Sequence, residues 1–171
     1  MKSKASDDYK IIKKLGERGF EEIYLVEKGK KFYALKKSKS KLSEKEIEAY
    51  NQIIDILNKI DNEHVIKYHR KFKEKDSFNI LMEYAGDQNL KQFIKNFKDK
   101  NILIEEKIIK DIIIQICEGL KEIHKNKLIH GDLTPDNIFM DKNYKIKIGD
   151  FGVSKILEPN QTTETQIGKI N

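Results

Sequence analysis

The sequence has only one cysteine and two arginines, and it has no long apolar run. Cys117 cannot form a disulfide within the chain, which favours a reducing compartment, the cytoplasm or the nucleus. It lies in an isoleucine-rich segment, so we expect a small buried side chain rather than a reactive thiol. No stretch of about 20 apolar residues occurs, so the sequence predicts no membrane-spanning helix and no membrane partner.

The charge of the chain is positive but spread out. Lysine and arginine number 34 against 28 aspartates and glutamates, a formal net charge of +6. A nucleic-acid-binding surface more often clusters arginine with exposed aromatic side chains. Here the only guanidinium groups belong to Arg18 and Arg70, and lysines occur along the whole chain. We therefore expect a solvated surface and no nucleic-acid partner.

The first half of the sequence predicts a small sheet with one helix. Residues 9–37 alternate apolar and polar positions between glycines, which is typical of short strands. Residues 43–46, Ser-Glu-Lys-Glu, have the form of a capping box, and apolar residues follow at helical spacing, so a helix is expected from there to about Ile60. Two further strands are expected at 66–74 and 78–83.

The second half predicts mainly helices. Helices are expected at about 89–98 and 105–125, followed by strand-like segments at 138–141 and 144–148. The helical periodicity predicts that the buried face of the long helix carries Ile109, Ile112, Ile113, Ile116 and Leu120.

Together these segments predict an α+β fold with two lobes. The N-terminal lobe would comprise residues 9–85 and the C-terminal lobe residues 86–171, with the two joined near residues 84–88. With 38% hydrophobic residues, the chain has enough apolar side chains for one core and a second small one.

The strongest chemical signal is the segment His-Gly-Asp-Leu-Thr-Pro-Asp-Asn at residues 130–137, followed by Asp-Phe-Gly at 150–152. Phosphoryl transfer needs a carboxylate beside the attacking hydroxyl and oxygen ligands that hold magnesium against the phosphates. The two motifs together resemble the catalytic loop and the magnesium loop of eukaryotic-type protein kinases. The resemblance implies that Asp132 is the catalytic base and that Asn137 and Asp150 bind Mg²⁺.

Further segments follow in the order that this family has. Tyr33-Ala34-Leu35-Lys36 resembles its third strand, where alanine covers adenine and lysine, here Lys36, acts in catalysis by gripping the α- and β-phosphates. Met82-Glu83-Tyr84-Ala85 resembles the hinge, whose backbone groups bind adenine. The resemblance covers about residues 9–170. It implies an ATP site lined by Leu15, Gly16, Ile23, Ala34, Lys36, Glu83, Ala85 and Phe139.

The glycine-rich loop departs from the family pattern. Of its three glycines only Gly16 is present, and Arg18 and Glu21 stand at the positions of the second and third. Glycines there let backbone amides approach phosphate oxygens, whereas Glu21 adds bulk and like charge near ATP. Arg18 is expected to offset this, either by pairing with Glu21 or by touching phosphate. We expect weaker ATP binding as a result.

The catalytic loop and the helix after the third strand depart as well. Gly131 replaces an arginine that reads a phosphate on the activation segment, so that regulation is not expected here. Thr134 replaces a lysine that neutralises the transferring phosphate, and loss of one such donor costs on the order of 3 kcal/mol at the transition state. Ile53 falls where a helical glutamate should pair with Lys36, so Glu46 or Glu48 would take that role only if the helix carries an insertion.

The resemblance implies an ATP- and Mg²⁺-dependent phosphotransferase of the protein Ser/Thr kinase type, with ATP and a protein substrate as partners. A pseudokinase that acts as a nucleotide-binding or regulatory module is the alternative. A small-molecule kinase is a third reading, which His-Gly-Asp suggests and Asp-Phe-Gly-Val-Ser-Lys at 150–155 opposes. The family pattern continues beyond Asn171, so we expect the chain to stop within the activation segment and to expose part of the apolar face of helix 105–125.

Overall fold

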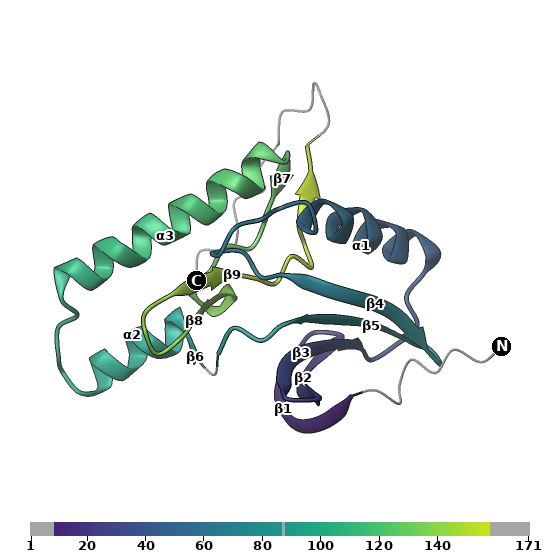
Figure 1. Ribbon diagram of the computed structural model, residues 1–171, viewed down its shortest axis with the longest axis horizontal. Helices are drawn as coiled ribbons and strands as arrows, with labels where there is room; N and C mark the ends of the chain where they lie inside the picture. Colours follow the sequence, from purple (N-terminus) through teal and green to yellow (C-terminus); the bar gives the residue numbers. More distant parts are fainter. Residues whose placement is uncertain (1–8, 87, 158–171) are drawn as a thin grey trace.

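The first half of the chain forms a five-stranded antiparallel sheet. The computed structural model describes residues 9–86 and 88–157 (Figure 1). The strands lie in the order β1-β2-β3-β5-β4, so the last two strands of the sheet are interchanged relative to the sequence. Their bounds are β1 Lys10–Arg18, β2 Glu21–Lys28, β3 Lys31–Ser38, β4 Tyr68–Glu74 and β5 Ser77–Glu83.

Helix α1, Glu44–Leu57, packs against this sheet and begins where the sequence predicts. The Ser43 side chain accepts a hydrogen bond from the Glu46 N–H, and the Glu46 carboxylate accepts one from the Ser43 N–H, which completes the capping box. The helix ends three residues before Ile60. Its Ile54 side chain packs among apolar residues of β3 and β5, including Ala34.

The second half is built from two helices and short paired strands. The expected strand-like segments after residue 137 form a hairpin, which pairs with a two-residue strand before α2 in the order β6-β8-β9. The bounds are β6 Gln88–Asn89, α2 Leu90–Asp99, α3 Glu106–Lys125, β7 Leu128–Ile129, a 3₁₀ turn Pro135–Asn137, β8 Ile138–Met140, β9 Ile146–Ile148 and β10 Lys155–Ile156. Strand β10 pairs with β7. Within the described residues, no helix combines the length and apolar character that crossing a bilayer requires.

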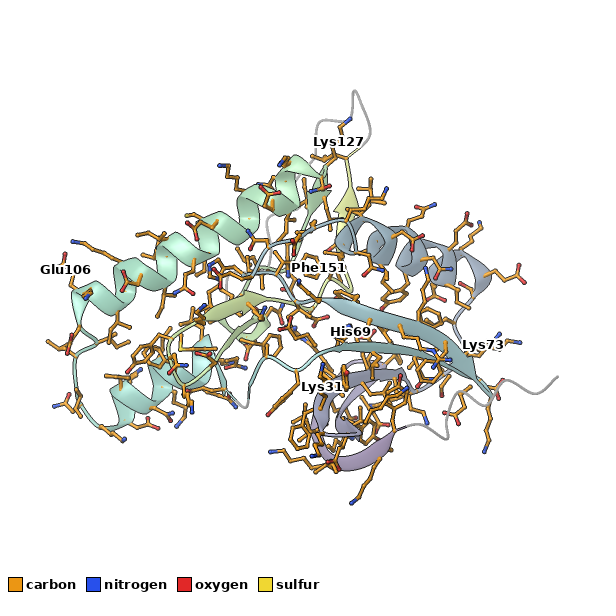
Figure 2. The ribbon with its side chains drawn as sticks, in the orientation of Figure 1. Lys31, His69, Lys73, Glu106, Lys127 and Phe151 are labelled. Carbon is orange, nitrogen blue, oxygen red and sulfur yellow. The ribbon has the colours of Figure 1, made fainter. Side chains whose placement is uncertain are left out.

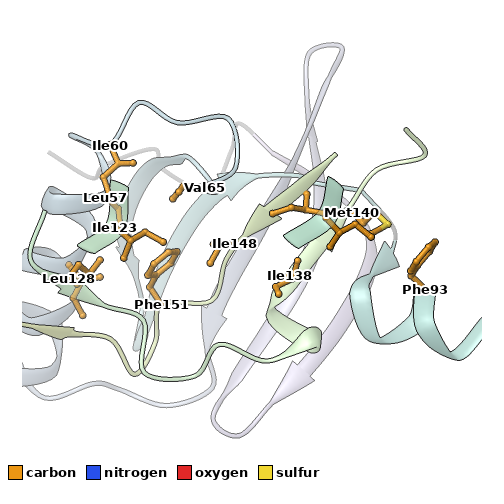
Figure 3. Packing of buried hydrophobic residues seen from close by; sticks show 13 residues of the cluster. Leu57, Ile60, Val65, Phe93, Ile123, Leu128, Ile138, Met140, Ile148 and Phe151 are labelled. Atoms are coloured by element: carbon orange, nitrogen blue, oxygen red, sulfur yellow. The ribbon is translucent and has the colours of Figure 1, made fainter. Parts of the chain in front are cut away.

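One apolar cluster joins the two halves. It contains Leu57 of α1, Ile123 of α3, Ile148 of β9 and Phe151, which lies in the interior between the helices and the large sheet (Figures 2 and 3). Backbone hydrogen bonds cross the same boundary, from the Ile66 N–H to the Ile148 carbonyl at 2.9 Å and from the Ile148 N–H to the His64 carbonyl at 2.8 Å. These contacts fix the strands that precede residue 150 against the first half of the chain.

The buried face of α3 includes Ile112, Ile116 and Leu120, as the sequence predicts, but not Ile109 and Ile113. Ile112 is 5% exposed and Ile123 is fully buried, whereas Ile109 and Ile113 are 42% and 53% exposed. Cys117 is also exposed, so the expectation that it is buried was wrong. Residues 109, 113 and 117 follow each other at intervals of four and share one stripe, which lies about 100° around the helix from the buried stripe at 108, 112 and 116. As expected, an apolar part of α3 is exposed in the described chain.

The new assignment of the α3 faces is tested with two neighbouring residues. Ile112→Ala removes a buried side chain and should lower the free energy of unfolding by about 2–5 kcal/mol. Ile113→Ala removes an exposed one, and the change should stay within about 0.5 kcal/mol. Urea denaturation of both variants measures the difference. Equal losses would mean that both faces are buried in solution.

Candidate active site

A cleft lies between the large sheet and the β8–β9 hairpin. Its volume is about 820 Å³ with its open mouth included. All eight residues that the resemblance assigns to the ATP site line this cleft, together with Asp150. The eight come from β1, β2 and β3, from the end of β5 and the segment after it, and from β8. Residues far apart in the sequence are therefore gathered around one cavity.

Outside residues 82–86, three lining residues were not foreseen. Ile66, which precedes β4, contributes an apolar wall beside Ala34 and Phe139. Asn89 and Gln92 also line the cleft, and they form the capping box that begins α2. The capping pattern was visible in the sequence, but its position beside the cleft depends on the pairing of β6 with β8.

Lys36 reaches the inner end of the cleft from β3. Its side chain is buried, and its Nζ lies 2.7 Å from Glu21 Oε2 and 2.8 Å from Asp150 Oδ1. Burial alone would lower the pKa of Lys36, but the carboxylates of Asp150 and Glu21 outweigh it and the pKa is raised. The lysine is therefore a charged group held between two anions.

The partner of Lys36 is neither Glu46 nor Glu48, the two helical glutamates that the sequence left open. Both are exposed on α1. The position counted from the sequence carries Ile53, which is buried in the core. Glu21 supplies the carboxylate because Ile23 of β2 pairs with Lys36 of β3. A residue two positions along β2 lies on the same face of the sheet and diagonally opposite Lys36.

Helix α1 contributes a hydroxyl that binds Glu21, the partner of Lys36. Tyr50 donates a hydrogen bond from its hydroxyl to Glu21 Oε1 at 2.7 Å. Burial, and then the neighbouring Glu21 carboxylate, raise the pKa of Tyr50 above its usual range, so the hydroxyl keeps its proton and remains a donor. Glu21 is thus bound by two groups from different elements.

The motif residues Asp132, Asn137 and Asp150 lie together on the other side of Lys36. The 3₁₀ turn that begins at Pro135 directs the buried Asn137 inward, where its Nδ2 donates to the Asp132 carbonyl at 2.6 Å and to Asp132 Oδ2 at 3.0 Å. Asp150 follows β9 with a φ of +61°, a left-handed conformation that turns its carboxylate back toward Lys36.

His130 connects the two motifs. Its Nε2–H donates to the Gly149 carbonyl at 2.8 Å, and its Nδ1 accepts from the Asp132 N–H at 3.3 Å. Burial lowers the pKa of His130, which favours the neutral ring that this pattern requires. The ring also contacts Phe151, with centroids 4.7 Å apart. Asp132 and Asp150 are therefore positioned through one buried histidine.

Arg18 enters this cluster from the end of β1. Its Nη1 lies 2.5 Å from Asn137 Oδ1 and 3.0 Å from Asp150 Oδ2, and its Nη2 lies 3.3 Å from Asp132 Oδ2. Among the described residues its ion-pair partners are these two aspartates rather than Glu21. Of the two roles considered for Arg18, pairing with Glu21 therefore does not form, and contact with phosphate stays a prediction. Burial would raise the pKa of Asp150, but Lys36 and Arg18 outweigh that effect and hold the pKa below its ordinary value.

The oxygen atoms of this cluster can be compared with the ligands that a metal ion requires. A single nitrogen, Arg18 Nη1, contacts both Asn137 Oδ1 and Asp150 Oδ2. The two oxygens therefore face one shared cationic group. Carboxylate and amide oxygens are ligands that Mg²⁺ accepts, so the residues fit a magnesium ion.

The local backbone explains why position 131 carries glycine instead of arginine. Its φ is +80°, and a Cβ at this position would lie 2.8 Å from the Val153 carbonyl oxygen. The backbone therefore leaves no room for the arginine that the family pattern has there. The hydroxyl of Thr134 is buried without a hydrogen-bond partner among the described residues. It supplies no substitute for the lysine at that position.

Restoring the arginine should therefore damage the fold. Gly131→Arg is expected to lower the free energy of unfolding by about 1–3 kcal/mol through backbone strain, with crowding against Val153 in addition. The matched control is Gly16→Ala, because a Cβ at Gly16 meets nothing within 4 Å. Chemical denaturation of the two variants compares them. An arginine variant as stable as the wild type would show that this segment has another conformation in solution.

Comparison with known proteins gives consistent matches. A family model described as the protein kinase domain matches residues 9–171. The chain is 31% identical over 170 residues to the probable serine/threonine-protein kinase nek2 of Dictyostelium discoideum, covering 95% of this chain and 41% of that protein. It is 34% identical over 155 residues to the serine/threonine-protein kinase Nek11 of Homo sapiens, covering 87% and 24%. The chain thus spans less than half the length of these relatives.

Proposed function

Since the chain belongs to the protein kinase family, we propose that it forms the nucleotide-binding part of a kinase that transfers the γ-phosphate of ATP to serine or threonine hydroxyls of a protein. The observation that carries this is the convergence of Lys36, Asn137 and Asp150 at the inner end of an apolar cleft. Relatives named as serine/threonine-protein kinases support the class of acceptor. The single cysteine favours the cytoplasm or the nucleus as the location of the protein.

The apolar part of the cleft is proposed to hold adenine. Ala34 and Phe139 lie on the two walls, and both belong to one apolar cluster with Met82. Backbone groups of Glu83 and Ala85 would bind the edge of the base. The N–H of Glu83 already donates to the Lys67 carbonyl at 2.8 Å, so its carbonyl oxygen is the group that we assign to adenine.

The polar end is proposed to hold the phosphates. Lys36, charged and buried, would bind the α- and β-phosphates, and Asn137 and Asp150 would hold Mg²⁺. When bound, Mg²⁺ neutralises charge on the phosphates. Asp132 would orient the attacking hydroxyl and accept its proton, since Asn137 fixes its carboxylate at 3.0 Å. No lysine stands at position 134, so the transfer step is expected to be slow.

A pseudokinase that binds nucleotide and serves as a regulatory module is the second candidate. The observation that favours it is the position of Arg18, which contacts all three motif residues of the catalytic cluster. The two candidates share nucleotide binding and differ in phosphoryl transfer. The variant Asp132→Asn distinguishes the two candidates. If the chain is a kinase, this variant loses the phosphoryl transfer that the wild type performs. Under either candidate it keeps nucleotide binding.

Nucleotide binding is tested through Asp150. ATP with magnesium should stabilise the wild-type chain by about 2.7 kcal/mol at a hundredfold excess over Kd. Asp150→Asn should remove the magnesium-dependent part of this effect, because the carboxylate would no longer bind the metal. Thermal unfolding with and without EDTA measures it. Asp76→Asn, in the exposed turn between β4 and β5, is the control and should respond as the wild type does. Equal stabilisation of wild type and Asp150→Asn would exclude the proposed role.

A further inference from the structure

Both carboxylate oxygens of Glu21 are bound by side chains of the same chain. Oε2 lies 2.7 Å from Lys36 Nζ, and Oε1 accepts a hydrogen bond from the Tyr50 hydroxyl at 2.7 Å. The Glu21 side chain is 23% exposed, so solvent screens these contacts only in part. The sequence predicts that Glu21 opposes the nucleotide phosphates through its bulk and charge. In the structure an ammonium group and a hydroxyl compensate that charge.

The contact between Glu21 and Lys36 is set by the sheet. In the antiparallel pair of β2 and β3, Glu21 lies opposite Ser38 and Ile23 lies opposite Lys36. Residues two apart on each strand share one face, so the side chains of Glu21 and Lys36 are diagonal neighbours on that face. The place of the carboxylate therefore follows from strand register, and α1 adds only the Tyr50 hydroxyl.

The ammonium group of Lys36 can bind carboxylates and a phosphate together, because it has three N–H donors. Lys36 lines the cleft in which the proposed function places the phosphates. Asp150 Oδ1 lies 2.8 Å from Lys36 Nζ, but the proposed function also assigns Asp150 to the metal. Glu21 is the carboxylate partner without that second role. Because a lysine side chain is long and flexible, a partner that holds it in the cleft lowers the cost of binding a phosphate there.

We propose that Glu21 is a positioning residue for the nucleotide phosphates, which it serves by holding Lys36 in the cleft from the neighbouring strand. The proposal rests on the proposed function, because that function assigns the phosphates to Lys36. It reverses the expected effect of position 21: the carboxylate strengthens nucleotide binding, and the glycine of the family pattern would weaken it. Without Glu21 the ammonium group would be drawn toward Asp150 alone.

The test separates the phosphates from the rest of the nucleotide. Glu21→Gln removes the charge at nearly constant size, and Glu21→Gly restores the glycine of the family pattern. Both variants should bind ADP with magnesium about threefold to tenfold more weakly than the wild type, which corresponds to the cost of ordering one flexible side chain. Their affinity for adenosine should stay unchanged, because adenosine has no phosphate for Lys36. Isothermal titration calorimetry measures both ligands, and thermal unfolding verifies that each variant is folded.

The matched control removes the same charge from the next residue of the strand. Glu22 binds Lys14 Nζ at 2.8 Å and does not line the cleft. Glu22→Gln should leave the affinities for ADP and adenosine unchanged. A loss of ADP affinity as large as that of Glu21→Gln would assign the effect to the strand as a whole and overturn the proposal.

A carboxylate supplied from α1 tests whether Glu21 acts through Lys36. Ile53 of α1 and Lys36 line one small cavity, so a glutamate at position 53 would lie beside the lysine. The double variant Glu21→Gly with Ile53→Glu should regain most of the ADP affinity that Glu21→Gly loses. A folded double variant without this recovery would overturn the positioning role. If the buried glutamate prevents folding, the two single variants of Glu21 decide.

The remaining outcomes distinguish this inference from the proposed function. Unchanged or tighter ADP binding by Glu21→Gln and Glu21→Gly would overturn the inference and show that the carboxylate opposes the phosphates. An equal loss of affinity for ADP and adenosine would also overturn it, because Glu21 would then support the fold alone. In both cases the proposed function stands if the wild type binds ADP with magnesium through Asp150. If the wild type binds neither ligand, both proposals fail.

Discussion

The arrangement of the site depends on one buried ammonium group. Lys36 lies inside the protein, and a buried charge is tolerated only with partners that compensate its lost hydration. Asp150 and Glu21 supply them from opposite sides of the cleft. Asp150 reaches Lys36 through its left-handed backbone, and Glu21 reaches it through the register of β2 on β3. Loss of either carboxylate would leave the ammonium group of Lys36, around which the cluster is arranged, with only part of its compensating charge.

The apolar core holds the charged groups around Lys36 close to one another. Phe151 is buried beside Leu57, Val65 and Ile148, so the residue next to Asp150 is anchored in a cluster that both halves of the chain build. The hydrogen bonds between residues 64–66 and Ile148 hold the same boundary. Because cores are close-packed, a shift of the hairpin would move Asp150 away from Lys36. Stability and site geometry therefore rest on the same contacts.

The departures from the family pattern form two groups with different physical reasons. The local backbone requires glycine at position 131, because its positive φ and the nearby Val153 carbonyl oxygen leave no room for a side chain. Arg18 and Glu21 instead belong to one electrostatic arrangement, in which each charge lies on groups of opposite sign. The missing helical glutamate fits the second group, because Glu21 already neutralises Lys36 and α1 needs only the Tyr50 hydroxyl there. Ile53 is then free to join the core.

The sequence by itself determined the family, the α+β fold and most of the elements, because motifs and helix caps depend on residues close together in the chain. The capping box at Ser43 and the spacing from Asp132 to Asn137 are of this kind. Only the tertiary structure decided which glutamate meets Lys36, where Arg18 points and which stripe of α3 is buried. Each of these depends on strand register or on packing between distant segments. Isoleucines on both stripes of α3 gave the same local signal, and only the packing of β7 and β9 beside the helix chose between them.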